Sequence, residues 1–523
     1  MKHFILSILL LAMGHSLYAQ DAPPKDWFHL DMKDNNYMGI SSYKAYNEIL
    51  KGKKPKTVIV AVLDSGVDDH HEDLKDIMWT NPGEIPGNGI DDDHNGYIDD
   101  IHGWNFIGGK DGKNVGEEQL ELTRLYVYYS KKFKDTDPNT LSRKQKKEYD
   151  RYKTIKKDFD KARKDAQENL NRMEGLLDAL TELQKAYGKD EFTAADLPEI
   201  KAKNPMAGQV IQILQKGGTS AELRKGLQGA YDYYHKNVMV YYNPDFNARK
   251  IVGDHYEDSY EKFYGNNDSK GPDSSHGTHV SGIIAAKRNN GIGIDGIADN
   301  VQIMSIRAVP DGDERDKDVA NGIIYAVDNG AKIINMSFGK PYSWDKKAVD
   351  KAVKYAAKHG VLLVHAAMND SKNVDEKIVF PNDRYDKKGL FGPRYAKTWL
   401  DVGALSWKKG EDAVATFSNY GQNNVDVFAP GVAIYSTTPE DTYASYNGTS
   451  MATPVTAGIA AVLMGYYPNL SAKDVKKIIM DSTVPLTQKV KKTDTHALAP
   501  MKELCRTGGV VNLYRALKLA ETY

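Results

Sequence analysis

Three separate blocks of the sequence hold a serine, a histidine and an aspartate that together offer the parts of an activated nucleophile. Ser450 lies in YASYNGTSMATPVTAG, at the predicted start of a helix. A serine there is usually only a cap, and it becomes a nucleophile when a histidine takes its proton and an acid orients that histidine. His276 in SSHGTHVSGIIAAK and Asp64 in KTVIVAVLDSGVDDHHEDL are the candidate base and acid. The three residues predict acyl transfer.

Other uses of these residues have less support. Ser450 is not within G-x-S-x-G, so the nucleophile elbow of the α/β-hydrolases is excluded. His276 and His279 lie three apart on a predicted helix and offer a pair of metal ligands. However, no acidic residue follows at the spacing of metal-hydrolase motifs.

The blocks VLDSGVDDHHEDL, HGTHVSGIIAA and NGTSMATPVTAG resemble the three signature blocks of the subtilisin-like serine peptidases, in the same Asp-His-Ser order. The resemblance covers residues 56–109 and 252–520 and implies a serine endopeptidase that acts on polypeptides. It further implies that Asn369 in VLLVHAAMNDS supplies an oxyanion amide. An esterase with the same triad, or a catalytically silent binding protein of this fold, remain alternatives.

The resemblance also implies a substrate cleft with two backbone edges. One edge is Ser337, Phe338 and Gly339 in NMSFGKP, which would pair with an extended peptide. The other edge lies around Gly312 in AVPDGDE. The acidic residues of that second turn favour either basic substrate side chains or simple solvation.

The segment GIGIDG, residues 291–296, matches a dinucleotide-binding pattern but has the wrong context. It follows a predicted helix and precedes a strand, whereas the nucleotide motif follows a strand and opens a helix. By resemblance it is the calcium loop of the family. The implied ligands are the side chains of Asp73 and Asn290 with the carbonyls of Ile292 and Ile294.

A second acidic loop, GIDDDHNGYIDD, places Asp91, Asp93 and Asn95 as an EF-hand loop begins. Position twelve is His102, where such a loop needs an acid. An ion site and a tight Asn-Gly turn with solvated carboxylates both remain open. Structural Ca²⁺ is the cofactor that we expect, with no organic cofactor.

Runs rich in β-branched residues alternate with helical patterns outside the middle of the chain. Strands are predicted at 57–63, 301–308, 332–336, 361–365 and 399–404, and helices at 319–327 and 344–359. This alternation predicts an α/β fold: a doubly wound, mostly parallel sheet with helices on both faces.

Residues 111–250 depart from that pattern and predict a long α-helical insertion. Apolar residues step by three or four among charged ones, at Ile155, Phe159, Ala162, Ala166, Leu170, Met173, Leu177 and Leu180. Shorter helices are predicted near 206–214 and after Thr219. The insertion packs either on itself or over the cleft. It divides a catalytic domain of residues 56–110 and 251–523, which a lead segment of residues 20–55 precedes.

The chain begins with an apolar run flanked by Lys2 and small residues, which predicts a signal peptide at 1–19 and an exported protein, periplasmic or secreted. No later stretch is apolar enough to span a membrane. Lys and Arg total 70 against 71 Asp and Glu, a formal net charge of −1, so nothing favours a nucleic-acid partner. The single cysteine, Cys505, excludes an intramolecular disulfide and is expected to be buried and inert.

Overall fold

The computed structural model describes residues 22–196, 204–386 and 392–523, and the predicted signal peptide lies outside them. The described chain divides into two compact units. Residues 122–247 form one unit, and residues 23–121 with 248–523 form the other.

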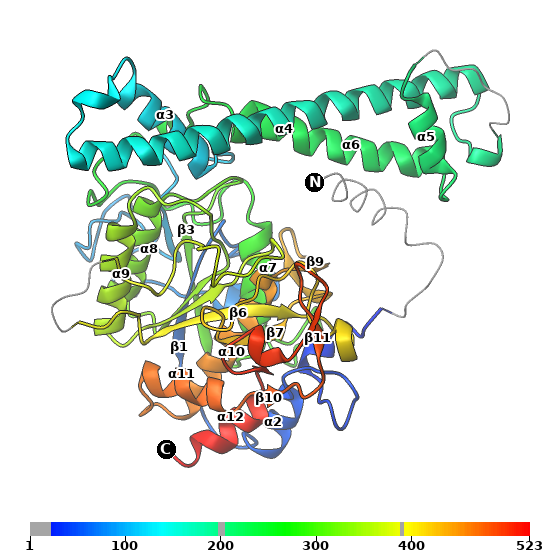
Figure 1. Cartoon of the computed structure of the whole chain (residues 1–523). Coiled ribbons are helices and arrows are strands. Elements are labelled where there is room, and N and C mark those ends of the chain that lie inside the picture. Colours follow the sequence, from blue (N-terminus) through cyan, green and yellow to red (C-terminus); the bar gives the residue numbers. More distant parts are fainter. Residues whose placement is uncertain (1–21, 197–203, 387–391) are drawn as a thin grey trace. The chain divides into compact units, whose positions relative to one another are not determined.

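The larger unit is built on a nine-stranded sheet in the order β10-β13-β7-β6-β5-β4-β1-β3-β2 (Figure 1). The five predicted strands all form and pair in parallel. They are β1 (Val58–Asp64), β3 (Val301–Arg307), β4 (Ile333–Met336), β5 (Leu362–Ala366) and β6 (Trp399–Leu405). Strands β2 (Gly103–Asn105) and β7 (Val427–Pro430) extend the parallel order, whereas the edge pair β10 (Val484–Pro485) and β13 (Gly509–Val510) is antiparallel.

Helices cover both faces of this sheet. Val60 and Val62 of β1 are buried in one cluster with residues of α7 (Ser275–Ala285) and α10 (Thr449–Tyr466). Leu63 instead lies against α8 (Asp316–Asp328), where a Cβ added to Gly322 would come within 2.6 Å of it. Because successive strand residues point to opposite faces, the two sets of helices lie on opposite sides. The predicted doubly wound fold is confirmed.

The remaining elements of the larger unit lie around this frame. Besides short 3-10 helices, they are the helices α2 (Ser42–Glu48), α9 (Lys346–Lys358), α11 (Ala472–Asp481) and α12 (Leu513–Ala520), the hairpin of β8 (Ile434–Thr438) and β9 (Thr442–Tyr446), and the short antiparallel pair of β11 (Val490–Lys491) and β12 (Leu498–Ala499). The lead segment packs against this unit, since Trp27 is fully buried and its Nε1 donates to the Val432 carbonyl at 3.1 Å.

The smaller unit is helical and has its own core. Helix α4 (Arg143–Tyr187) begins with a capping box between Ser142 and Gln145 and ends at Gly188. Its apolar face is buried with α5 (Ala207–Leu214) and α6 (Ser220–Lys236), and Thr219 caps α6 as predicted. Residues 121–133 form α3 (Glu121–Phe133). The row of apolar residues predicted along this helix therefore packs against other helices of the same unit.

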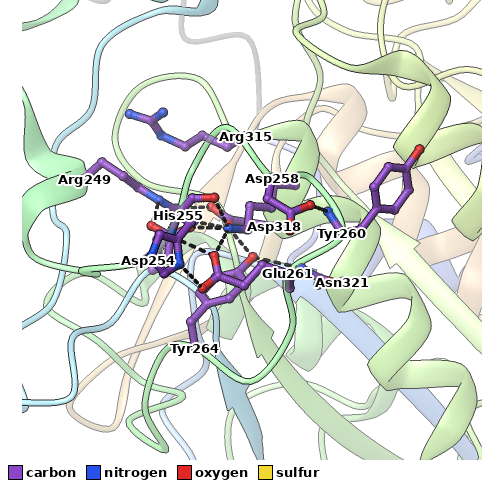
Figure 2. Close-up of polar contacts among 12 residues, drawn as sticks. Arg249, Asp254, His255, Asp258, Tyr260, Glu261, Tyr264, Arg315, Asp318 and Asn321 are labelled. Carbon is purple, nitrogen blue, oxygen red and sulfur yellow. Dashed lines mark hydrogen bonds and ion pairs between the residues drawn. The ribbon is translucent and has the colours of Figure 1, made fainter.

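Buried charges hold the segment through which the chain returns to the larger unit (Figure 2). Arg249 donates from Nη1 to Asp318 at 2.6 Å and from Nε to Asp254 at 2.7 Å. Lys317 Nζ lies 2.6 Å from carboxylate oxygens of Asp254 and Glu261. Removing one partner from such a buried set would leave an uncompensated charge. The network therefore fixes the return segment to α8.

Among the described residues, no helix is both long and apolar enough to cross a membrane.

Candidate active site

The predicted acid and base meet at the carboxyl end of β1. Asp64 is the last residue of β1, His276 lies in the first turn of α7, and His276 Nδ1 donates to Asp64 Oδ1 at 2.7 Å. Asp64 is 1% exposed, and the same oxygen accepts from the Ser65 amide at 2.8 Å. Gly277 permits this approach, because a Cβ there would lie 2.1 Å from the Gly66 carbonyl oxygen.

The environment favours a protonated His276 more than water does. Burial opposes the charge, but the Asp64 carboxylate and, with a smaller effect, Asp273 raise the pKa of His276 above its usual 6.5. The Nδ1 hydrogen bond leaves Nε2 as the basic nitrogen of the neutral ring. Nε2 is therefore the nitrogen through which His276 could accept a proton.

Ser450 lies in the first turn of α10, with Gly448 as the N-cap. Its Oγ donates to the Ser337 carbonyl at 3.0 Å, and Ser337 Oγ donates to the Ser450 carbonyl at 2.9 Å. Asp64, His276 and Ser337 line one cavity of about 320 Å³. The Ser450 hydroxyl therefore donates its one proton to Ser337, and it would have to break that hydrogen bond in order to donate to His276.

Asn369 lies beside the same helix start. Its Oδ1 accepts hydrogen bonds from the backbone and the hydroxyl of Thr449, at 2.9 and 3.0 Å, which leaves the Nδ2 donors directed elsewhere. Helix N-termini carry amides without intrahelical acceptors, and Ser450 contributes one. Met368 precedes Asn369 with φ of 78°, a left-handed conformation that non-glycine residues rarely adopt. Such strain occurs preferentially at functional sites.

The two predicted cleft edges lie in short extended segments with one side already paired. Lys340 exchanges two backbone hydrogen bonds with Phe380, at 2.8 and 2.9 Å. On the other edge, Asp311 donates to the Gly116 carbonyl at 2.8 Å and accepts from the Glu118 amide at 2.9 Å. Alternate residues of an extended segment turn their peptide groups to opposite sides.

The neighbouring glycines, Gly339 and Gly312, therefore turn their peptide groups away from these outer partners. In the described chain neither has a backbone hydrogen bond. Phe338 is buried behind its edge, at 6% exposed.

The residues of the first predicted calcium loop come together. Asp73 is 1% exposed, and its Oδ1 accepts from Asn290 Nδ2 at 2.6 Å. The Ile294 amide lies 3.5 Å from Asp73 Oδ2, and the Ile292 amide donates to Asn290 Oδ1. Burial raises the pKa of Asp73. A cation there would need the Asn290 amide to rotate so that its oxygen faces Asp73.

The second acidic loop folds as tight turns. Asp91 accepts from the amides of Asn95 and Gly96, at 3.0 and 2.8 Å. His102 donates to the Trp79 carbonyl, which agrees with its departure from an EF-hand.

Three carboxylates in and near this loop form a cluster that differs from the predicted ligand set. Glu84, Asp93 and Asp100 have oxygens within 4.8 Å of one another. Burial raises the pKa of Asp100 to about 6. Sequence spacing did not identify Glu84 or Asp100, because neither is part of the EF-hand pattern.

Two further predictions concern buried side chains. His279 donates from Nε2 to the Ala444 carbonyl at 3.0 Å, and burial lowers its pKa to about 3, so it is a structural histidine. Cys505 is fully buried and burial raises its pKa, as expected for an inert thiol. Arg307, which lines the same cavity as Asp64 and His276 and is 1% exposed, carried no sequence signal beyond its place at a strand end.

The known proteins to which this chain is similar include serine proteinases and subtilisins. A model described as the Subtilase family matches residues 55–500. A thermophilic serine proteinase of Bacillus sp. strain AK1 is 38% identical over 244 residues, 46% of this chain and 54% of that protein. Subtilisin DY of Bacillus licheniformis is 37% identical over 45% of this chain and 78% of its own, and thermitase of Thermoactinomyces vulgaris 37% over 42% and 70%.

A solved protease structure from Pseudoalteromonas arctica is 26% identical, with a TM-score of 0.40 over 49% of this chain and 79% of that one. The present chain spans about half the length of the Bacillus AK1 proteinase.

Proposed function

Because the chain belongs to the Subtilase family, we propose that it is an exported serine endopeptidase that hydrolyses polypeptides through Asp64, His276 and Ser450. The observation that carries this proposal is the 2.7 Å hydrogen bond from His276 Nδ1 to the buried Asp64, in a cavity that Ser337, the hydrogen-bond partner of Ser450, also lines. The homology to subtilisins supports the same reaction.

In the proposed mechanism Ser450 Oγ leaves the Ser337 carbonyl and attacks the scissile carbonyl carbon. His276 Nε2 takes the serine proton and then gives it to the leaving amine. Asp64 holds the ring and stabilises the imidazolium. The Ser450 amide and Asn369 Nδ2 donate to the oxyanion. A water molecule then attacks the acyl-enzyme: His276 takes a proton from the water and gives it to Ser450 Oγ as the acyl group is released.

The substrate backbone would bind as a strand between the two cleft edges. Gly339 and Gly312 offer unpaired peptide groups on either side, which is the requirement for strand addition. Main-chain pairing gives affinity for any extended peptide, so a polypeptide is the proposed substrate class.

We also propose that Asp73 and Asn290, with the carbonyls of Ile292 and Ile294, hold a structural Ca²⁺. Two observations support this assignment: the ligands are hard oxygen atoms, and the buried Asp73 carboxylate forms no ion pair among the described residues. The cluster of Glu84, Asp93 and Asp100 is the second candidate. Export rests on the sequence of residues 1–19 alone.

Substitution of the nucleophile and base tests the proposal. Ser450→Ala and His276→Ala should each lose nearly all peptide hydrolysis, about 10⁶-fold in kcat for the corresponding losses in subtilisin, a relative of this chain. The double variant should be no worse than either single one, since the two residues act as one unit. Circular dichroism would confirm that the fold persists. Activity of either variant within about tenfold of the unsubstituted enzyme would exclude the mechanism.

A further inference from the structure

The cavity beside the proposed catalytic pair is lined by more acidic than basic residues. Asp64, Asp273 and Asp311 line it, and among the described residues Arg307 is the one permanently charged basic residue there. The proposed mechanism requires a neutral His276, and in that state the lining residues carry three negative charges and one positive charge, a net −2. The cavity is therefore negative when the enzyme is ready to attack a substrate.

Two of these carboxylates are not neutralised by a permanently charged side chain. Asp64 has His276 as its ion-pair partner and no other in the described chain, and its Oδ2 is buried without a hydrogen-bond partner there. Asp273 accepts from the Ser275 amide at 3.0 Å and forms no ion pair among the described residues. Coulomb attraction is stronger between protein walls than in open water, so both carboxylates would stabilise a cation that enters this cavity.

Arg307 is fixed in the wall of the cavity and offsets only part of the negative charge. It is 1% exposed and donates to the backbone carbonyls of Ser65 and Val115. Burial lowers the pKa of Arg307 to about 10, and the charges of Asp268 and Asp273 oppose that shift. The guanidinium is therefore already included in the net charge of −2.

Apolar side chains complete the lining. Val309, Pro310 and Tyr446 line the same cavity, whereas Asp273 and Asp311 are exposed and so lie toward its opening. Lysine and arginine lay their alkyl stems along apolar surface and keep the charged group at the water-exposed end. A tyrosine ring also attracts a cation over its face. An apolar wall with carboxylates at its opening therefore fits a basic side chain.

We propose that this cavity binds a lysine or arginine side chain of the polypeptide substrate, and that Asp273 and Asp311 are specificity-determining residues. This inference rests on the proposed function. The cavity extends from His276 to Ser337, whose carbonyl accepts from Ser450 Oγ, so the basic residue lies close to the scissile bond. The volume of about 320 Å³ is at the lower end of the range of ligand pockets, about 300–1,000 Å³, and suits a single side chain. Neither aspartate takes part in bond cleavage.

Pairs of peptides that differ in one side chain test this preference with the full-length enzyme. Each pair carries lysine or norleucine, which is uncharged and similar in shape, at one of the two positions on either side of a bond that a peptide library shows to be cleaved. At one of these positions kcat/KM should be about tenfold higher for lysine, since each partly exposed ion pair adds about a few-fold attraction. A ratio within about twofold at every position would overturn the inference.

Charge-removing variants assign the preference to the two aspartates. Asp273→Asn and Asp311→Asn should each lower the lysine-to-norleucine ratio to about threefold, and the double variant should abolish the preference. Because both peptides meet the same enzyme, the effect of Asp273 on the pKa of His276 cancels in the ratio. Asp370→Asn is the matched control, since the Asp370 carboxylate pairs with Lys372 at 3.4 Å and does not line the cavity. Its ratio should equal that of the unsubstituted enzyme, and a preference that persists in the double variant would contradict the assignment.

The salt dependence of the unsubstituted enzyme gives a second measurement that does not depend on the folding of a variant. The Debye length falls from about 10 Å at 0.1 M salt to about 3 Å at 1 M, so the ratio should fall at least about threefold between these concentrations. A ratio that salt leaves unchanged would exclude an electrostatic preference.

The outcomes also distinguish this inference from the proposed function. Absence of Ser450-dependent cleavage of every peptide would remove the function itself. Cleavage without a preference for lysine would remove only the role of Asp273 and Asp311.

Discussion

The Asp64 carboxylate raises the pKa of His276, with a smaller contribution from Asp273, and this has a measurable consequence. In the proposed mechanism the base acts in its neutral form, so kcat/KM should fall as the pH drops through a midpoint above 6.5. Asp64→Asn removes the main source of the shift, and the midpoint should move to lower pH. The activity that remains should be about 10⁴-fold lower, as in other triads that lose this acid.

A pH–rate profile from pH 4 to 9 measures this shift. Asp273→Asn serves as the control, because Asp273 acts on His276 only through its charge and should move the midpoint less, in the same direction. An unchanged midpoint in Asp64→Asn would show that Asp64 does not set the charge state of the base.

Asn369 should contribute to kcat more than to substrate binding. Replacement by alanine removes the Nδ2 donor and should lower kcat by about 10²–10³-fold with little change in KM. Because Asn369 Oδ1 also holds Thr449, Asn369→Asp is the matched variant: it keeps the acceptor oxygen and loses the donor. Steady-state kinetics of both variants test the role, and a loss below about tenfold in both would assign Asn369 to turn structure.

At this scale the sequence predicted which residues meet but not how they are oriented. Asp64 ends a buried strand and His276 lies in the first turn of a helix, and the glycine after His276 lets the two elements approach closely. The hydrogen bonds between Ser450 and Ser337 depend on side-chain torsions that no residue pattern encodes. The left-handed Met368 is likewise hidden, since its residue type argues against that conformation.

The loop of residues 286–296, between α7 and β3, is the element whose stability should depend on an ion. Chelation by EDTA should lower the Tm by several degrees, and Ca²⁺ should restore it, because a ligand at 100 times its Kd adds about 2.7 kcal/mol to the free energy of unfolding. Asp73→Ala should abolish the response to both. Differential scanning calorimetry measures the effect.

Asp76→Ala is the matched control for this experiment, since the Asp76 carboxylate pairs with Lys287 at the surface and faces no proposed ligand. Its response to EDTA should equal that of the unsubstituted protein. An unchanged Tm in EDTA for the unsubstituted protein would mean that the acidic loops act only as turns.

Among the elements, strands and long helices were easier to predict than ion sites. The runs of β-branched, apolar residues predicted five strands, because strands buried in a parallel sheet are continuous apolar runs. These strands are β1, β3, β4, β5 and β6. The spacing of apolar residues three or four positions apart predicted most of α4. By contrast, the carboxylates of Glu84 and Asp100 come together with Asp93 only through the folding of a loop, and a linear EF-hand pattern could not include them.

The whole chain divides into a helical unit and an α/β unit, each with its own buried core. The sequence predicted a helical insertion at residues 111–250, because the pattern there changes from strand-helix alternation to apolar residues at every third or fourth position among charged ones. The sequence did not indicate that the lead segment packs into the α/β unit. It also did not indicate the buried ion pairs of residues 118–121 and 249–254, which hold the segments where the chain leaves the α/β unit and returns to it. Those contacts join residues more than fifty positions apart.

The central claim is that Ser450 is the one activated serine of the protein, and reaction with a fluorophosphonate tests it most directly. Intact-protein mass spectrometry should show a single adduct, and peptide mapping should place it on Ser450. Ser450→Ala should show none, and His276→Ala should react far more slowly, because the hydroxyl then lacks its base. An intact protein that stays unlabelled, or an adduct on another residue that survives in Ser450→Ala, would contradict the account.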